Sequence, residues 1–150
     1  IARIDDDDTW AKNHLESILK FTQDGNYEFT SAQYIERRYG KDSIVDGVGA
    51  KDPYYTRSDK PITGNNPFIG GTSTWFYRSY LRFMKYNPNC WRKKWNKVND
   101  IDLSLRKFKA GVRIGFLNEV HAYVIPREGE DTVGLAAYQD ADRKDYSVHN

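Results

Sequence analysis

The sequence predicts an α/β domain, because stretches with strand composition alternate with stretches that have helical periodicity. Aromatic and β-branched residues are enriched at 27–35, 112–116 and 119–125, as in strands. Apolar residues recur at helical spacing within 9–21 and 98–110. The chain has 150 residues, the size of one domain, and is long enough to bury a hydrophobic core.

Charge and cysteine content limit the class of protein. The 23 basic and 21 acidic residues leave a net charge of +2, so bulk electrostatics do not favour nucleic-acid binding. The single cysteine, Cys90, excludes an intrachain disulfide and fits a reducing compartment. No apolar run reaches the roughly 18 residues of a membrane span. We therefore expect a cytoplasmic protein with no transmembrane segment and no nucleic-acid partner.

The first element is a short apolar strand, residues 1–4, that runs directly into four aspartates, Asp5 to Asp8. If the strand continues, its alternation places Asp5 and Asp7 on one face and Asp6 and Asp8 on the other. Same-face carboxylates roughly 7 Å apart repel by about 2.4 kcal/mol at an effective dielectric of 20. A hard cation such as Mg²⁺ or Mn²⁺ would reverse that sign, since it prefers oxygen ligands.

The alternative for the aspartates is helix capping, because Asp is favoured at the N-cap and in the first turn. Asp8 is the expected cap of a helix over 9–21, although four aspartates exceed what capping requires. The apolar face of that helix is Ala11, Leu15, Ile18 and Leu19. His14 is expected to pack or to lie on the surface, since no other residue nearby has metal-ligand spacing.

The next segments are a turn at 23–26 and a strand at 27–35. Residues 37–66 lack periodicity and form an unusually long connection. Two interpretations are open for it: a substrate-side loop with a small hairpin of 43–48 against 54–55, or a disordered insertion.

An extended segment follows at 67–69, and then Gly70, Gly71 and three hydroxyl residues predict the start of a helix over 75–84. Glycine permits close approach of the backbone, and exposed N–H groups at a helix start favour anionic or oxygen-rich ligands. The aromatic stripe of this helix is typical of a core. The basic, tryptophan-containing segment 90–97 is expected to be a solvated edge near an anionic substrate.

The last predicted helix begins at 98, and Gly111 ends it. Asp100 lies at its start, where a carboxylate either caps the helix or reaches a substrate. Two strands, 112–116 and 119–125, complete the predicted fold. Residues 136–150 are a polar tail, and the domain itself is predicted to span residues 1–135.

Three stretches, in this order, resemble the second half of a family 2 nucleotide-sugar glycosyltransferase of the GT-A fold: IARIDDDDTWAKNHL, FIGGTSTWFYRSYL and VNDIDLSLRKFKAGVRIGFLNEVHAYV. The resemblance implies a mixed sheet with flanking helices. It also implies a partial GT-A fold, because the nucleotide-binding half that precedes these stretches in relatives has no counterpart in this chain.

The resemblance assigns roles to individual residues. Asp5 and Asp7 form the DxD element that holds Mn²⁺ or Mg²⁺, with Asp7 the more direct metal ligand and Asp5 nearer the ribose of the donor. Asp100 occupies the position of the catalytic base. Relatives carry Glu before this aspartate, whereas this chain has Asn99, so a neighbouring carboxylate that would tune the base is missing.

The remaining site residues implied by the resemblance are on the substrate side: Gly70, Gly71, Thr72 and Asp102. We expect residues 5–8, residues 70–74 and Asp100 to converge on one cleft, because motifs so far apart in sequence would meet there to share a substrate.

The implied activity is an inverting, metal-dependent transfer of a sugar from a nucleotide-sugar donor to the hydroxyl of a small molecule or glycan, in polysaccharide or glycoconjugate synthesis. The rival interpretation is a non-catalytic metal- or carbohydrate-binding module, or an inactive fragment. An exposed strand at residues 1–4 also predicts either homo-oligomers that meet there or poor order of these residues. The position of Asp100 relative to the aspartates separates enzyme from binding module.

Overall fold

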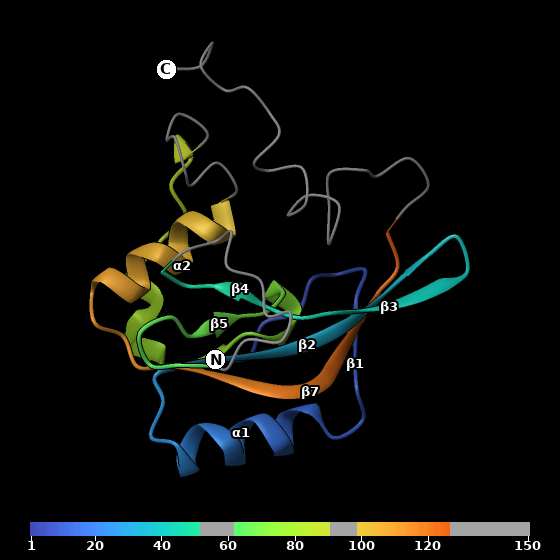
Figure 1. The fold of residues 1–150 in the computed structure, drawn as a ribbon, viewed down its shortest axis with the longest axis horizontal. Coiled ribbons are helices and arrows are strands. Elements are labelled where there is room, and N and C mark those ends of the chain that lie inside the picture. The colour runs from blue at the N-terminus through green and yellow to red at the C-terminus, as the bar shows by residue number, and fades with distance from the viewer. Residues whose placement is uncertain (52–61, 91–98, 127–150) are drawn as a thin grey trace.

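The computed structural model describes residues 1–51, 62–90 and 99–126. A mixed sheet lies between helix α1 on one side and helix α2 with strands β4 and β5 on the other (Figure 1). The order of the sheet is β1-β7-β2-β3, and β6 also pairs with β2. This confirms the expected α/β class with a mixed sheet flanked by helices.

The bounds of the described elements are β1 (Thr9–Trp10), α1 (His14–Asp24), β2 (Phe29–Arg38), β3 (Lys41–Val45), β4 (Val48–Gly49), β5 (Phe68–Ile69), the 3₁₀ helix η1 (Thr72–Thr74), β6 (Phe76–Tyr77), the 3₁₀ helix η2 (Ser79–Phe83), α2 (Asn99–Lys109) and β7 (Ile114–Val124). Residues 52–61, 91–98 and 127–150 lie outside the described residues, and with them most of the basic tryptophan segment and the predicted polar tail.

The centre of the sheet is the parallel pair β2 and β7. The expectation of two separate strands at 112–116 and 119–125 is wrong, since β7 runs without a break from Ile114 to Val124. Its register against β2 shifts on both sides of Gln33. Such an irregularity lets a strand accommodate extra residues without ending, which is why the polar residues at 118–119 did not terminate it.

Residues 1–4 have a sheet neighbour. Ala2 forms an antiparallel bridge with Phe76 of β6, and the Arg3 N–H donates to the Trp75 carbonyl at 2.9 Å. This corrects the expectation that the first strand loses its neighbours, while association of two copies through its exposed side chains stays a prediction.

The four aspartates form a turn instead of continuing the strand. The Asp8 N–H donates to the Asp5 carbonyl at 3.2 Å. Before the turn the chain pairs with β6, and after it Thr9–Trp10 pairs with β7 on the far side of the sheet. Because the chain must cross from one side to the other here, the predicted alternation of Asp5 and Asp7 against Asp6 and Asp8 is wrong.

Helix α1 begins at His14, later than predicted, and Asn13 precedes it in place of Asp8. The pairing of β1 with β7 explains the late start, because it holds Thr9–Trp10 in strand conformation. The buried face also differs from the predicted one: His14 and Ile18 are buried, whereas Leu15 is about half exposed, at 48%. The prediction that His14 serves packing is confirmed.

Strand β3 forms a hairpin with β2. Tyr39 and Gly40 make its two-residue turn and both have positive φ, 53° and 73°, as the favoured primed hairpin turns require. The predicted hairpin of 43–48 against 54–55 is wrong on its first side, because residues 43–45 pair with β2. Residues 54–55 lie outside the described residues.

The predicted helix over 75–84 is replaced by β6 and η2. Phe76 and Tyr77 pair with Phe29 and Thr30 at the start of β2, and a long-range ladder of this kind overrides local helical periodicity. The expectation that the aromatic stripe forms core holds for Trp75 but is wrong for Tyr80 and Phe83, which are 55% and 72% exposed. Trp75 is 2% exposed and meets the Phe29 ring edge-on with 5.0 Å between centroids.

Helix α2 matches its prediction closely. It ends before Gly111, whose φ of +80° is the left-handed conformation that glycine adopts after a helix. Ile101 and Leu105 are buried from the predicted apolar face and pack with Val48 of β4. Within the described ranges, no helix is both long and apolar enough to span a membrane.

Candidate functional site

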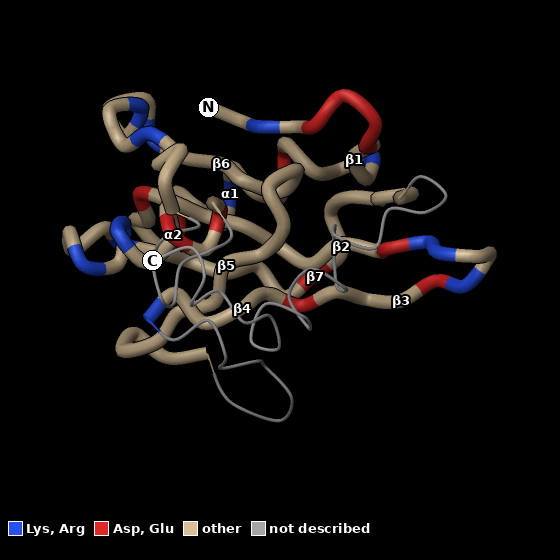
Figure 2. The backbone as a smooth tube through the Cα atoms, turned by 90° about the horizontal axis from the view of Figure 1, so that it is seen from above, with Lys and Arg blue, Asp and Glu red and all other residues tan. Residues whose placement is uncertain are grey.

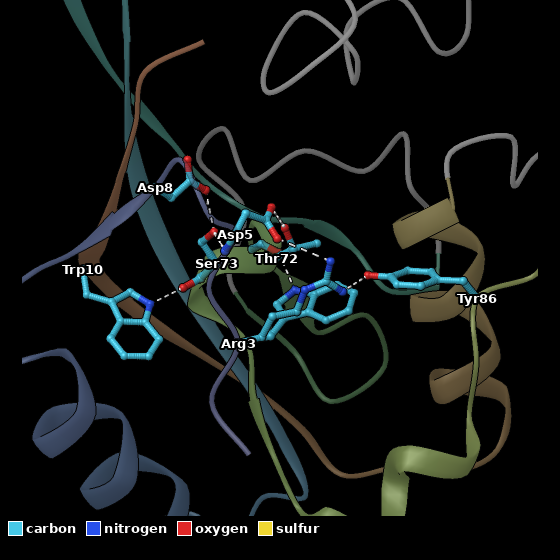
Figure 3. Close-up of polar contacts among 9 residues, drawn as sticks. Arg3, Asp5, Asp8, Trp10, Thr72, Ser73 and Tyr86 are labelled. Atoms are coloured by element: carbon cyan, nitrogen blue, oxygen red, sulfur yellow. Dashed lines mark hydrogen bonds and ion pairs between the residues drawn. The ribbon is translucent and has the colours of Figure 1, made fainter. Parts of the chain in front are cut away.

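Two turns that are distant in sequence are joined by hydrogen bonds (Figure 3). We call residues 5–8 the Asp turn and η1, Thr72–Thr74, the hydroxyl turn. The Thr72 hydroxyl donates to Asp5 Oδ2 at 2.9 Å, and the Asp5 N–H donates to the Ser73 hydroxyl at 3.0 Å. Two of the three motifs expected to converge therefore meet, whereas their convergence with Asp100 on one cleft stays a prediction.

Ser73 is the centre of this junction. Its hydroxyl donates to Asp8 Oδ2 at 2.5 Å, and its carbonyl accepts from the Trp10 indole N–H at 2.7 Å. Ser73 is buried, at 3% exposure, so these bonds are shielded from water. The hydroxyl turn therefore fixes the Asp turn at both of its ends.

The Asp turn concentrates negative charge. Burial raises the pKa of Asp8, and the charges of Asp7, Asp5 and Asp6 raise it further, against the Ser73 hydrogen bond, which lowers it. Asp6 and Asp7 are exposed and make no hydrogen bond or ion pair to any described residue. Figure 2 shows the turn as an unbroken acidic stretch of backbone beside β1. Two carboxylates are thus tied to the protein and two face solvent.

A cation lies on the other side of Asp5. Arg3 Nη2 is 3.4 Å from Asp5 Oδ1, and Arg3 Nη1 donates to the Tyr86 hydroxyl. The Arg3 guanidinium also lies over the rings of Trp75 and Tyr86, 5.6 and 5.2 Å from their centroids. This arrangement holds the Asp5 carboxylate between a hydroxyl and a guanidinium.

Gly70 and Gly71 are required by packing against β2. A Cβ on Gly70 would lie 2.0 Å from the Ala32 carbonyl oxygen, and one on Gly71 would lie 2.6 Å from the Tyr34 ring. Gly70 is buried, whereas Gly71 and Thr72 are half-buried. The close approach predicted for the glycine pair is therefore an approach to residues of β2, to the Ala32 backbone for Gly70 and to the Tyr34 ring for Gly71. Of these three residues, only Gly71 and Thr72 have surface for a ligand.

Asp100 lies in the first turn of α2 and is half-buried. Burial raises the pKa of Tyr34, and the negative charges of Glu36, Asp100 and Asp8 raise it further. Burial also raises the pKa of Tyr86, where Asp100 and Asp5 again add to the increase against the lowering effect of Arg3. Asp100 and the Asp turn therefore act on the same two tyrosines.

Asp102 has a structural position. Its side chain is fully buried, and Arg106 Nε donates to its Oδ2 at 2.9 Å, one helical turn along α2. A carboxylate that is 0% exposed and paired with a guanidinium cannot reach a substrate from this conformation. In this conformation Asp102 holds Arg106, and the substrate contact that the resemblance implies for it stays a prediction.

The described residues offer few protein ligands for a metal ion. Across residues 1–51, 62–90 and 99–126, no cluster of three or more His, Cys, Asp or Glu side chains has an arrangement that could hold a metal ion. Any cation at the Asp turn would take one or two carboxylates, as Mg²⁺ sites at substrate phosphates often do.

Several of these contacts were not predicted. Arg3 and Trp10 lie within the first resemblance stretch but were given no role, although Arg3 pairs with Asp5 and Trp10 bonds to Ser73. Tyr86, which bonds to Arg3, lies outside every motif. One signal did exist: Arg3 stands two residues before Asp5, so a strand would place both side chains on one face.

Searches of protein-family models, of curated proteins and of solved structures found no match to this chain.

Proposed function

We propose that this chain carries the metal-binding and acceptor-side part of an inverting glycosyltransferase that uses a nucleotide-sugar donor and a hydroxyl acceptor. The observation that supports the proposal is the joint position of two acidic features. The Asp turn and Asp100 are more than 90 residues apart in the sequence, yet the charges of Asp8 and Asp100 both raise the pKa of Tyr34, and those of Asp5 and Asp100 both raise the pKa of Tyr86.

Asp7 and Asp5 would hold a Mg²⁺ or Mn²⁺ ion. The crowding of four carboxylates suits a hard divalent cation with a largely aqueous coordination shell. So does the exposed side chain of Asp7, which has no partner among the described residues. Such an ion would supply charge neutralisation for the diphosphate leaving group. Thr72 and Arg3 hold the Asp5 carboxylate in place, so they act as positioning residues.

Asp100 would be the general base. The acceptor oxygen bonds to the anomeric carbon, its proton passes to an Asp100 carboxylate oxygen, and the bond from the anomeric carbon to the phosphate oxygen breaks, releasing the nucleoside diphosphate. Attack from the face opposite the leaving group inverts the anomeric centre. The half-buried position of Asp100 suits this role, because a substrate can reach the carboxylate while the protein orients it.

The rival function is a binding module without transfer activity. Such a module would need the acidic turn for a cation but would give no reason for Asp100 to share the surroundings of Tyr34 and Tyr86 with it. Binding of a sugar or a cation without any transfer would favour this rival.

The proposed activity is tested by incubating the protein with Mn²⁺, a panel of nucleotide sugars and hydroxyl acceptors, and detecting released nucleoside diphosphate and the glycoside. The assay uses residues 1–150 and, in parallel, the natural polypeptide that carries them. We expect transfer only where a nucleotide-binding half is present, because positioning of the donor alone is worth about 7 to 11 kcal/mol of the barrier. Sugar transfer by residues 1–150 alone would contradict the predicted need for a nucleotide-binding half. No sugar transfer in either sample would contradict the proposed activity.

The metal role of Asp7 has its own prediction. Calorimetric titration with Mn²⁺ should show weak binding to the wild type and binding at least about tenfold weaker to Asp7→Ala, since a direct ligand is lost. Asp6→Ala is the matched control, because it removes the same charge from the adjacent exposed position of the turn. Equal isotherms for the two variants would remove Asp7 from the metal site.

A further inference from the structure

A second feature with binding character is a pocket between α2, η2 and β6. Its volume is about 190 Å³. Aromatic and apolar side chains form most of its wall, among them Trp75, Tyr77 and Leu103. The charged residues that line it are all basic among those described: Arg3, Arg82, Lys85 and Lys107.

Lys107 is the unusual member of this wall. The residue is only 3% exposed, and its ammonium nitrogen lies 4.4 Å from the centroid of the Phe29 ring and 4.7 Å from that of Trp75. The ammonium forms no hydrogen bond or ion pair with any residue that the structure describes. A lysine this buried, with ring faces as the only partners of its ammonium among the described residues, is rare, because lysine is seldom buried unless it is paired.

The nearby carboxylates do not serve Lys107. Asp5 is bonded to Arg3, and the buried Asp102 is bonded to Arg106. Arg3 and Arg106 are thus each paired with a carboxylate, whereas the Lys107 ammonium has no carboxylate partner among the described residues.

The aromatic ring faces compensate only partly for the missing anionic partner of Lys107. They attract a desolvated cation, but an ammonium also carries three N–H donors that require acceptors. Burial, followed by the charges of Arg106 and Arg3, lowers the pKa of Lys107 to about 7. An anionic group in the pocket would supply both the acceptors and the missing charge.

The size of the pocket limits the ligand. A cavity of about 150 Å³ engineered into another protein holds one benzene molecule. At about 190 Å³, this pocket has room for one six-membered ring with one small substituent. Arg82 and Lys85, which are exposed, would draw an anion toward the pocket from solution.

We propose that this pocket binds a small organic anion, one six-membered ring in size, whose carboxylate or phosphate group pairs with Lys107 and whose ring packs on Trp75 and Tyr77. The site goes beyond the proposed sugar transfer, and its occupation requires neither a nucleotide sugar nor a divalent cation.

The test is calorimetric titration of the full chain, without metal or nucleotide sugar, using benzoate and glucose 6-phosphate as probes. Benzyl alcohol and glucose are their neutral counterparts, and inorganic phosphate tests the anion without a ring. We expect at least one ring-bearing anion to bind about tenfold or more tightly than its neutral counterpart and than inorganic phosphate. Preference for benzoate identifies a carboxylate site, and preference for glucose 6-phosphate identifies a phosphate site.

Lys107→Met removes the charge while keeping an unbranched apolar side chain that suits the aromatic surroundings. We expect it to weaken binding of the preferred anion at least tenfold. Lys109→Met is the matched control, since Lys109 is exposed two residues farther along α2, and it should bind like the wild type. Repeating the titration at pH 8 in buffers of different ionisation enthalpy should reveal proton uptake by the wild type that Lys107→Met lacks.

Equal binding of charged and neutral probes by the wild type would overturn the proposal. Unchanged anion binding by Lys107→Met would overturn it too. Because neither result involves Mn²⁺, a donor sugar or Asp100, a failure here is distinguishable from a failure of the proposed transferase.

Discussion

Asp100→Asn is expected to lower the turnover number for sugar transfer by about 10²- to 10⁴-fold, the range that a general base contributes. The amide keeps the size of the carboxylate and its place in the first turn of α2 but cannot take up the acceptor proton. The carbonyl of Asp100 accepts from the Ser104 hydroxyl at 2.7 Å, and this backbone contact is unaffected by the substitution. The loss should therefore fall on turnover, with little change in KM or in unfolding temperature.

The matched control is Asp6→Asn, which removes a carboxylate from the exposed part of the Asp turn. It should retain most of the activity, and its thermal unfolding should match that of the wild type. The decisive measurement is the initial rate against pH, in which Asp100→Asn should lose the acidic limb that reports the base. A variant that keeps wild-type turnover would show that another group, or water, takes the proton.

Lowering the pH from about 7 toward 4 is expected to destabilise the fold by about 3 kcal/mol through a buried histidine pair. His14 of α1 and His121 of β7 are each 1% exposed, and their Nδ1 atoms are 3.1 Å apart. Burial, followed by the charge of His121, lowers the pKa of His14 to about 4. The Nε2 atom of His14 is buried without a hydrogen-bond partner, so a proton there would lack an acceptor.

The direction of the pH dependence follows from the protonation of His14 in the unfolded and the folded chain. An unfolded chain protonates His14 below its ordinary pKa of about 6.5, whereas the folded chain keeps it neutral down to about pH 4. The contribution is therefore complete above pH 6.5 and is lost as the pH falls through that window, by up to about 1.4 kcal/mol for each pH unit.

Urea denaturation at intervals from pH 7.5 to 4.5 measures this slope. Most carboxylates titrate lower, so the change between pH 6.5 and 5 isolates the histidine contribution. His14→Leu, which cannot be protonated, should flatten the dependence in that interval. The same slope in the variant and the wild type would assign the acid sensitivity to other groups.

Local sequence was sufficient where the local signals agree with the tertiary structure. The helical periodicity of α2 and the glycine that follows it predicted its bounds, which agree closely with Asn99–Lys109. The strand composition of β2 and the aromatic content of the core were likewise readable from residue types. Sequence also selected Asp5 and Thr72 as site residues before their hydrogen bond was known.

Other elements depended on partners that are distant in the sequence. Thr9–Trp10 looked like the start of a helix, but β7 pairs with it, more than a hundred residues later. Phe76–Tyr77 has helical periodicity, but it pairs with β2 as an antiparallel strand. Each ladder satisfies backbone donors and acceptors that no local periodicity reports, so the tertiary structure decided both segments.

The same limit applies to charge. Nothing in the local sequence separates Lys107 from Lys109, two lysines near the end of one helix. Their environments differ because Trp75 and Phe29 pack over one and leave the other in solvent. Residue type and spacing predicted which helix would form and where it would stop. The packing of Phe29 and Trp75 against that helix decided which of its charges would be buried, because burial depends on neighbours that the local pattern does not contain.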